Sequence, residues 1–119
     1  IILETSIEDF DVKLQELISS KKMDAIFALD EHSATASMKM ALKQGIKIPE
    51  ELNVIGFADG VWSRRLTPSL STVSQHAPEI GAKAAELLIH KLNSKDEFYQ
   101  PQTVVIKTEL RQRESTRKL

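Results

Sequence analysis

One strand–helix–strand unit, which runs from Asp24 to Asp59, constrains the fold more than any other part of this chain. An apolar run at 25–29 stops abruptly at acidic residues, a helical pattern continues to Gly45, and a second apolar run at 54–57 leads to Asp59. Strands that alternate with helices indicate an α/β fold with parallel strands. Open parallel sheets bind ligands outside the carboxyl ends of their strands. The two acidic strand tips therefore mark the edge at which a ligand site is expected.

The same kinds of pattern extend along the whole chain. Apolar residues at helical spacing predict helices over residues 7–20, 32–45 and 78–93. Strands are predicted at residues 1–3, 24–29, 53–57, 71–73 and 103–107. The strand at 24–29 is apolar on both faces, so we expect helices on both sides of it. The predicted fold class is α/β, a three-layer, mainly parallel sheet with helices on both faces, incomplete in this chain.

The helix predicted at 32–45 has recognisable ends and one apolar side. Ser33 can cap its beginning, and Gly45 suits the left-handed position that ends a helix. Asp30, just before the helix, is a second candidate for the cap. The residues expected to face the core are Ala34, Met38, Ala41 and Leu42.

Composition excludes several classes of function. With 119 residues, 41% of them hydrophobic and 28% charged, the chain suits one soluble domain or a piece of a larger protein. Its formal net charge of −1 gives no general affinity for nucleic acid, and no apolar run is long enough to span a bilayer. The absence of cysteine rules out disulfides and thiolate zinc sites, and it fits a cytoplasmic location. Because the chain begins with Ile1 rather than Met, we expect the natural protein to have an upstream part.

The sequence also lacks the patterns that mark catalysis. There is no nucleophile elbow, no glycine-rich phosphate loop and no cysteine, and the histidines lack the spacing of metal ligands. We therefore predict no catalytic residue, no metal, no cofactor, and a protein that is not an enzyme. The enzyme alternative is a hydrolase or phosphotransferase that uses Asp30 and Asp59 as a carboxylate pair. Acidic residues at strand tips are also common as helix caps.

An ordered set of motifs extends over roughly residues 20–117, and its order and spacing make it specific. The set consists of Asp30, Gly45, Ile48-Pro49-Glu50, Gly56-Phe57, Asp59, Thr67-Pro68-Ser69-Leu70-Ser71-Thr72-Val73, Gln75, Gly81, Ala84-Ala85-Glu86-Leu87-Leu88 and Leu110-Arg111-Gln112-Arg113-Glu114-Ser115-Thr116. It resembles the C-terminal half of lac-repressor/galactose-repressor-type transcription regulators.

The resemblance implies a periplasmic-binding-protein-like fold, in which an effector binds between two lobes that the chain connects three times. Residues 1–75 would belong to the C-terminal lobe, and residues 76–108 would return to the N-terminal lobe. Residues 109–119 would form a return strand and a tail. The DNA-binding helix-turn-helix and most of the N-terminal lobe would be absent from this chain.

The function implied by this resemblance is the effector-binding and dimerisation part of a bacterial transcription regulator. Its partners would be a sugar-like small molecule, a second copy of the chain, and operator DNA through the absent N-terminal domain only, with no membrane contact. The alternative is a sugar- or solute-binding protein of a transport system. In the family the helices at 7–20 and 32–45 form dimer faces, where Ala34, Ala36 and Ser37 would permit close packing.

The helix at 78–93 has an apolar stripe that needs a partner. By the resemblance, that partner is the missing N-terminal lobe. We expect this chain either to self-associate, for example by exchanging this helix between copies, or to fold the helix back onto its own sheet.

Two pairs of residues at the strand tips correspond to effector contacts in the family, and both depart from the usual pattern. Leu29 and Asp30 stand where the family usually has Asn-Asp, and Ala58 and Asp59 stand where it commonly has Asp-Asp. Neither Leu29 nor Ala58 can bond a sugar hydroxyl. Either the effector is less polar than usual, or other groups hold it.

Further candidates lie in the loop beyond the third strand and after the fourth. Trp62 could stack on a sugar ring or pack at the sheet edge or a subunit contact. Arg64 and Arg65 could pair with an anionic effector or remain solvated. Gln75 matches a hinge and cleft position of the family. The basic tail after residue 110 is expected to be a solvated terminus.

Overall fold

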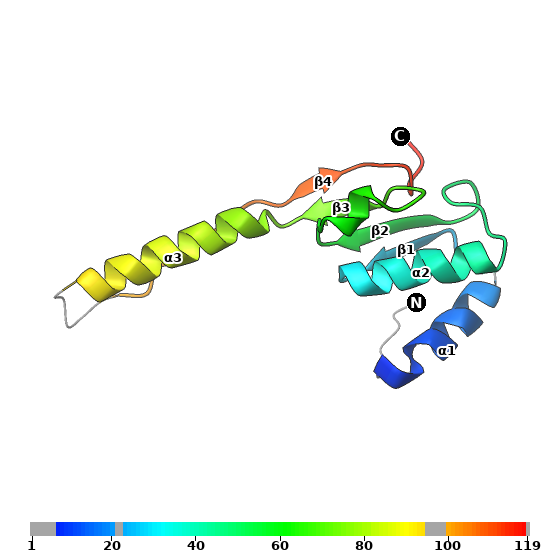
Figure 1. The fold of residues 1–119 in the computed structure, drawn as a ribbon, viewed down its shortest axis with the longest axis horizontal. Helices are drawn as coiled ribbons and strands as arrows, with labels where there is room; N and C mark the ends of the chain where they lie inside the picture. The colour runs from blue at the N-terminus through cyan, green and yellow to red at the C-terminus, as the bar shows by residue number, and fades with distance from the viewer. Residues whose placement is uncertain (1–6, 21–22, 95–99, 119) are drawn as a thin grey trace.

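The computed structural model describes residues 7–20, 23–94 and 100–118 (Figure 1). Its elements are α1 (Ile7–Ser19), β1 (Ala25–Ala28), α2 (Glu31–Lys43), β2 (Asn53–Phe57), the 3₁₀ helix η1 (Trp62–Arg64), β3 (Ser71–Ser74), α3 (Ala77–Asn93) and β4 (Glu109–Arg111). The three helices and the strands near residues 25, 53 and 71 are confirmed. The strand predicted at 1–3 lies outside the described residues.

The four strands form one mixed sheet in the order β1-β2-β3-β4. β2 runs parallel to β1 and to β3, whereas β4 is antiparallel to β3. Ala28 at the end of β1 lies opposite Gly56 near the end of β2. The prediction of a mainly parallel α/β sheet is therefore confirmed, and the two predicted strand tips lie at the same edge.

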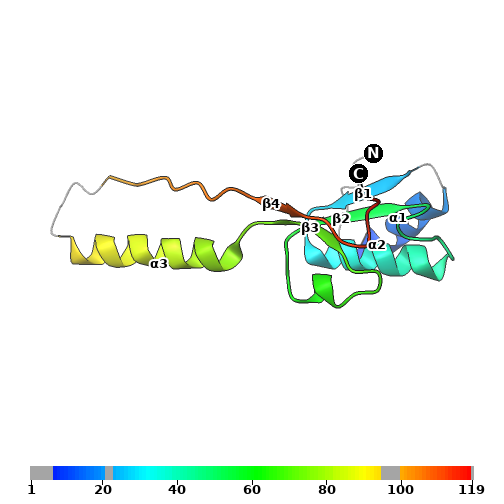
Figure 2. The same ribbon diagram turned by 90° about the horizontal axis from the view of Figure 1, so that it is seen from above.

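Helices α1 and α2 lie on one face of the sheet and enclose the core with it (Figure 2). The buried apolar residues are Leu14, Ile18, Ala28, Ala34, Met38, Ala41, Ile48, Leu52, Val54 and Leu70. Gly56 permits the close approach of α2 to the sheet, because a Cβ there would lie 3.2 Å from the Cβ of Ala34 and 3.3 Å from Leu70. This layer supplies the packing that holds the strand tips in place.

No described helix covers the opposite face of the sheet. Phe27 and Phe57 lie on that face with their ring centroids 6.3 Å apart, and Phe27 is 55% exposed. In the part of the chain that the structure describes, the predicted helices on both faces are therefore found on one face only. The physical reason is that α3, the remaining helix, extends away from the sheet.

The α3 arm projects beyond the carboxyl edge of the sheet and gives the molecule an elongated shape of 61 × 31 × 21 Å (Figures 1 and 2). No residue of α3 is buried, and Leu92 on its apolar stripe is 74% exposed. Folding of this helix onto its own sheet, one of the two expected outcomes, is therefore not observed. The chain leaves the sheet at His76, whose backbone is left-handed (φ 54°).

Residues 100–108 return from the arm toward the sheet without pairing to a strand. The strand predicted at 103–107 is therefore wrong for the described chain, although its apolar residues fit a strand. A strand needs a neighbour for its N–H and C=O groups, and the returning chain meets one only at β3. Pairing accordingly begins at Glu109, opposite Ser74.

The ends of α2 differ from the prediction in one detail. Asp30 caps the helix, since its Oδ1 accepts the N–H of Ser33 at 2.7 Å, so Ser33 is not the cap. Gly45 has φ 72° and follows the helix as predicted. Leu42, expected in the core, is 45% exposed. The buried side of α2 runs through residues 34, 38 and 41, and Leu42 lies beside it, turned partly toward solvent.

The C-terminal segment is built into the sheet and is not the solvated terminus that the sequence suggested. Ser115 is fully buried, and its hydroxyl donates to the carbonyl of Val54 at 2.6 Å and accepts the N–H of Ser71 at 2.8 Å. Its backbone N–H also donates to the carbonyl of Ser69 at 2.9 Å. One small side chain thereby joins the chain's last segment to β2 and β3.

Ser115→Ala should lower the free energy of unfolding by about 1–3 kcal/mol, because the buried N–H of Ser71 loses its acceptor. Urea unfolding measures the change. Ser20→Ala is the matched control, since Ser20 is exposed and, among the described residues, its hydroxyl donates to the carbonyl of Leu17 in α1. We expect that control to change the free energy of unfolding by no more than about 0.5 kcal/mol. Equal effects of the two substitutions would show that the buried bridge does not form.

Candidate functional site

The candidate site lies at the sheet edge where β1 and β2 end. Leu29 follows β1 and is 73% exposed, while Ala58 follows β2 and is partly exposed. Both come directly after paired strand residues, so the register of the sheet brings them to one edge. Gln75, after β3, is half-buried and belongs to the same edge. Trp62 begins η1 and is 62% exposed.

Asp59 is the centre of a buried ion-pair network at this edge. Its side chain is 3% exposed. Its Oδ1 accepts hydrogen bonds from the hydroxyl of Thr72 at 2.9 Å and from Nη2 of Arg113 at 2.6 Å, and its Oδ2 accepts one from Nη1 of Arg111. A third guanidinium, that of Arg64, lies 3.6 Å from Oδ2. Both oxygens are thus engaged by protein groups.

Two of these partners were missed by sequence reasoning, which assigned Arg111 and Arg113 to a solvated tail. They lie 52 and 54 residues beyond Asp59 in the chain. Pairing of β4 with β3 sets Arg111 opposite Thr72 and so delivers both guanidiniums to the carboxylate. The sequence contained one indication that Arg111 and Arg113 act together: they are two residues apart, and alternate residues of an extended chain point to the same side.

The network determines the ionisation of Asp59. Burial alone raises the pKa of this carboxyl group. The hydrogen bonds from Arg113 and Thr72, the positive charge of Arg113 and the hydrogen bond from Arg111 outweigh that effect and lower the pKa to about 2. The pKa of Arg111 is raised in turn, first by its hydrogen bond to Glu109 and then by that to Asp59. Asp59 is therefore a permanent anion that positions arginines.

A second carboxylate fixes the loop that carries Trp62 and Arg64. Oε1 of Glu31, in the first turn of α2, accepts hydrogen bonds from the N–H and the hydroxyl of Ser63, both at 3.2 Å. Ser63 is fully buried. Gly60 leaves room for this contact, because a Cβ there would fall on the Glu31 carboxylate. Sequence reasoning missed Glu31, since nothing local links it to a loop 32 residues away.

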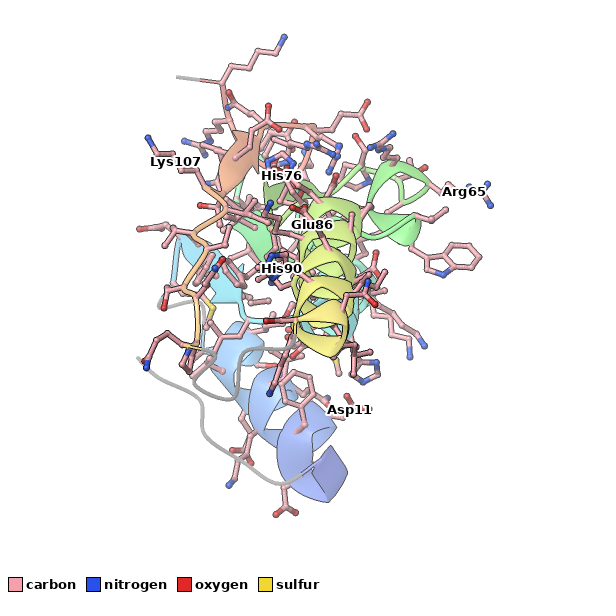
Figure 3. All side chains as sticks on the ribbon, turned by 90° about the vertical axis from the view of Figure 1, so that its left-hand side faces the viewer. Asp11, Arg65, His76, Glu86, His90 and Lys107 are labelled. Atoms are coloured by element: carbon pink, nitrogen blue, oxygen red, sulfur yellow. The ribbon has the colours of Figure 1, made fainter. Side chains whose placement is uncertain are left out.

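The two arginines of this loop differ in their surroundings. The side chain of Arg64 is 66% exposed and has its only described ion-pair partner in Asp59. The guanidinium of Arg65 lies 5.8 Å from the centroid of the Trp62 ring, and Figure 3 shows it pointing away from the sheet. Arg64 thus remains tied to the buried network, whereas Arg65 belongs to the outer surface.

The described residues offer no metal centre or membrane span. No three histidine, aspartate or glutamate side chains gather within residues 7–20, 23–94 and 100–118 in a way that could hold a metal. None of the described helices has the length and apolar character to cross a bilayer.

Asp59→Asn should flatten the acid limb of the stability profile. The folded pKa of about 2 lies below the ordinary value of 3.8. The ionised group therefore stabilises the fold above about pH 4, and this contribution is lost as the pH falls toward 2. Its size is about 2 kcal/mol. Urea unfolding from pH 7 to pH 2 measures it. Asp11→Asn, which removes an exposed carboxylate of α1 outside the Asp59 network, is the matched control for loss of one negative charge.

Gly60→Ala should lower the free energy of unfolding by about 1–2 kcal/mol, because the added methyl displaces Glu31 and removes its two hydrogen bonds to Ser63. Gly81→Ala provides the opposite control, since a Cβ at that exposed position of α3 meets nothing within 4 Å. There the expected change is a gain of about 0.5–1 kcal/mol in helix stability. Thermal and urea unfolding give both values, and a neutral Gly60→Ala would contradict the assigned role of Glu31.

The sequence matches the family described as "Periplasmic binding protein-like domain" over residues 4–116. The Ribose operon repressor of Bacillus subtilis is 36% identical over 92 residues, which cover 74% of this chain and 28% of that protein. The HTH-type transcriptional repressor PurR of Actinobacillus pleuropneumoniae is 29% identical over 108 residues, covering 90% of this chain and 32% of that protein. The chain thus spans about a quarter to a third of the length of these curated relatives.

Solved structures show the same architecture. A LacI family transcriptional regulator from Arthrobacter, solved in complex with lactose, gives a TM-score of 0.79 at 27% identity and covers 98% of this chain and 44% of that chain. The regulator CcpA of Lactococcus lactis gives 0.81 at 23% identity, covering 96% and 41%. The expected resemblance is confirmed: this chain belongs to the periplasmic binding protein-like domain family, and it corresponds to part of the effector domain of lac-repressor/galactose-repressor-type regulators.

Proposed function

We propose that this chain is the effector-binding and dimerisation part of a bacterial transcription regulator, which controls DNA binding by a helix-turn-helix outside the chain. The observation that carries the proposal is the shared edge of β1 and β2, where ligand-accessible side chains follow parallel strands. This is the edge at which open α/β sheets bind small molecules. The relatives named above are repressors, and one structural neighbour is solved with lactose, which supports a sugar-like effector.

The α3 arm supports a two-lobed arrangement. We assign residues 1–75 to a C-terminal lobe, residues 76–108 to a segment of an N-terminal lobe, and residues 109–119 to the return strand and tail. The apolar stripe of α3 is exposed, and residues 100–108 pair with no strand in the described chain. Both features are satisfied if the arm packs against further chain that completes the second lobe. The effector crevice then lies between that lobe and the strand tips.

The six predicted contact residues divide into two roles under this proposal. Leu29, Ala58, Trp62 and Gln75 present exposed or half-buried side chains, and we assign them to the wall of the crevice. Asp30 uses one carboxylate oxygen to cap α2, and both oxygens of Asp59 are taken by Thr72 and the arginines, so we assign both residues to shaping the wall. The wall is therefore less rich in hydrogen-bond acceptors than its acidic tips suggested.

The dimer face is assigned to the outer surface of α1 and α2. Ala34 and Ser37, expected to permit close packing between copies, are buried in the core and cannot contact a second copy. The accessible side of α2 instead carries Leu42, and the neighbouring hollow is lined in part by Lys39 and Leu66. A second copy on this face would link effector binding in one chain to the geometry of the pair.

The regulatory mechanism follows from linkage. An effector that binds one orientation of the two lobes more tightly shifts the population toward that orientation. The change in DNA affinity cannot exceed the difference in effector affinity between the two states. No covalent chemistry is required of any residue, and we therefore assign no enzymatic activity to the chain. A regulator that acts on DNA would have its site of action in the cytoplasm.

The test uses the complete gene product that contains this chain and the DNA upstream of its gene. We expect specific binding in a gel-shift assay and at least one sugar that changes the apparent DNA affinity about 5- to 150-fold, the usual range of allosteric coupling. Ala58→Trp should abolish the sugar response and retain DNA binding, because it fills the crevice. Ala25→Trp, at the opposite end of β1, is the matched control. Sugar binding without any DNA binding would favour the solute-binding alternative.

A further inference from the structure

We propose that the effector carries an anionic group, a carboxylate or a phosphate, and that Arg64 binds it. This inference rests on the proposed function and names the chemical class of its ligand. It starts from a property of the described strand tips: their carboxylates are engaged, whereas one accessible guanidinium is only loosely held.

The carboxylates at this edge already accept hydrogen bonds from the protein. Asp30 accepts the N–H of Ser33 at the start of α2, and Glu31 accepts both donors of Ser63. Both oxygens of Asp59 are occupied by Thr72 and by arginines of the returning chain. A neutral polyol held by a bidentate carboxylate needs a carboxylate free to accept two hydroxyl groups. Asp59, the buried candidate for that role, does not meet this requirement.

The remaining groups provide apolar surface and hydrogen-bond donors. Leu29 and Ala58 bring no hydrogen-bonding side chain. Val61 and Trp62, just before Arg64, are 67% and 62% exposed. The guanidinium of Arg64 supplies up to five N–H donors and no acceptor, so its preferred partner is an oxyanion. The half-buried amide of Gln75 can serve a hydroxyl elsewhere on the same ligand.

The charge balance of the network leaves Arg64 available. Asp59 and Glu109 provide two negative charges, and Arg64, Arg111 and Arg113 provide three positive charges. Arg111 and Arg113 bond the Asp59 carboxylate directly, whereas Arg64 remains 3.6 Å from it with a side chain that is 66% exposed. Turning Arg64 toward a ligand therefore leaves Asp59 satisfied. A carboxylate or phosphate of the ligand would then pair with the guanidinium of Arg64.

The neighbouring Arg65 provides a matched control within the same loop. It carries the same charge, but it lies against the Trp62 ring and points away from the sheet (Figure 3). A ligand attracted only by the general positive charge of this loop would respond equally to loss of either arginine. A ligand bound at the strand tips would respond to loss of Arg64 alone.

The test follows the arginine Nε–Hε signals of the ¹⁵N-labelled 119-residue chain by NMR at constant ionic strength. Glucose, gluconate, glucose 6-phosphate and inorganic phosphate are titrated in turn. We expect the Arg64 signal to shift with at least one anionic probe, with an apparent Kd at least about 10-fold lower than that for glucose. Read at the backbone N–H signal of Ala58, which both variants keep, Arg64→Gln should remove this difference and Arg65→Gln should retain it. Comparison of gluconate with glucose 6-phosphate distinguishes a carboxylate from a phosphate.

Three results would overturn the inference. If glucose bound as tightly as gluconate and glucose 6-phosphate, the anionic effector would be refuted. The proposed function would not be affected by that result. If Arg64→Gln and Arg65→Gln weakened binding of the anionic probe equally, the binding would be due to the general positive charge of the loop. Failure of every anionic probe to bind both this chain and the complete gene product would also refute it, because the second of these supplies the other wall of the crevice. The gel-shift experiment decides the proposed function separately in that case.

Discussion

The buried carboxylate of Asp59 is the contact on which the arrangement at the strand tips depends. It stands just beyond β2, yet its strongest partners come from β4 and the chain after it. Without that anion, two arginines would face each other across a buried site, which is unfavourable. The carboxylate therefore holds the returning chain against β3 and fixes the edge of the sheet. A few residues later, Ser115 also holds the returning chain against the sheet, because its buried hydroxyl bonds both β2 and β3.

This arrangement explains why the molecule has one packed region and one open arm. The chain leaves the sheet at His76, forms α3, and is captured again only where β4 meets β3. Everything between these two points lacks a buried residue in the described structure. Apolar surface of that extent is stable only against a partner. The two-lobed proposal supplies one, and it places the crossing points beside the effector site.

Local sequence patterns predicted the three helices, the strands near residues 25, 53 and 71, and the mainly parallel direction of the sheet. Periodicity identified α1, α2 and α3, and the left-handed Gly45 marked the end of α2 correctly. What sequence reasoning missed depends on contacts between distant residues. The strand predicted at 103–107 has the right composition but no described neighbour. Leu42 fits a helical stripe, but only the direction of the sheet decides which residues of that stripe are buried.

The candidate site shows the same division. The chain pattern predicted that the acidic tips near Asp30 and Asp59 share one edge of the sheet, and the family resemblance added Leu29 and Ala58 beside them. It could not show that Asp59 is neutralised by Arg111 and Arg113, since these arginines resemble an ordinary basic tail. Whether a carboxylate is free for a ligand depends on the tertiary fold. Acidic residues at a strand tip therefore predict the place of a site better than its chemistry.

A continuous set of polar contacts connects this site to His76, which would be the hinge in the proposed two-lobed arrangement. Arg111 bonds both Asp59 and Glu109, and Glu109 lies 3.8 Å from the imidazole of His76, where α3 begins. Such continuity is a physical route for coupling and not by itself a demonstration of it. Within the proposed mechanism it has a definite consequence. A ligand that draws Arg64 away from Asp59 leaves that carboxylate to Arg111 and Arg113, which strengthens its hold on the returning chain beside the hinge. Effector charge and lobe orientation would then be linked through one buried anion.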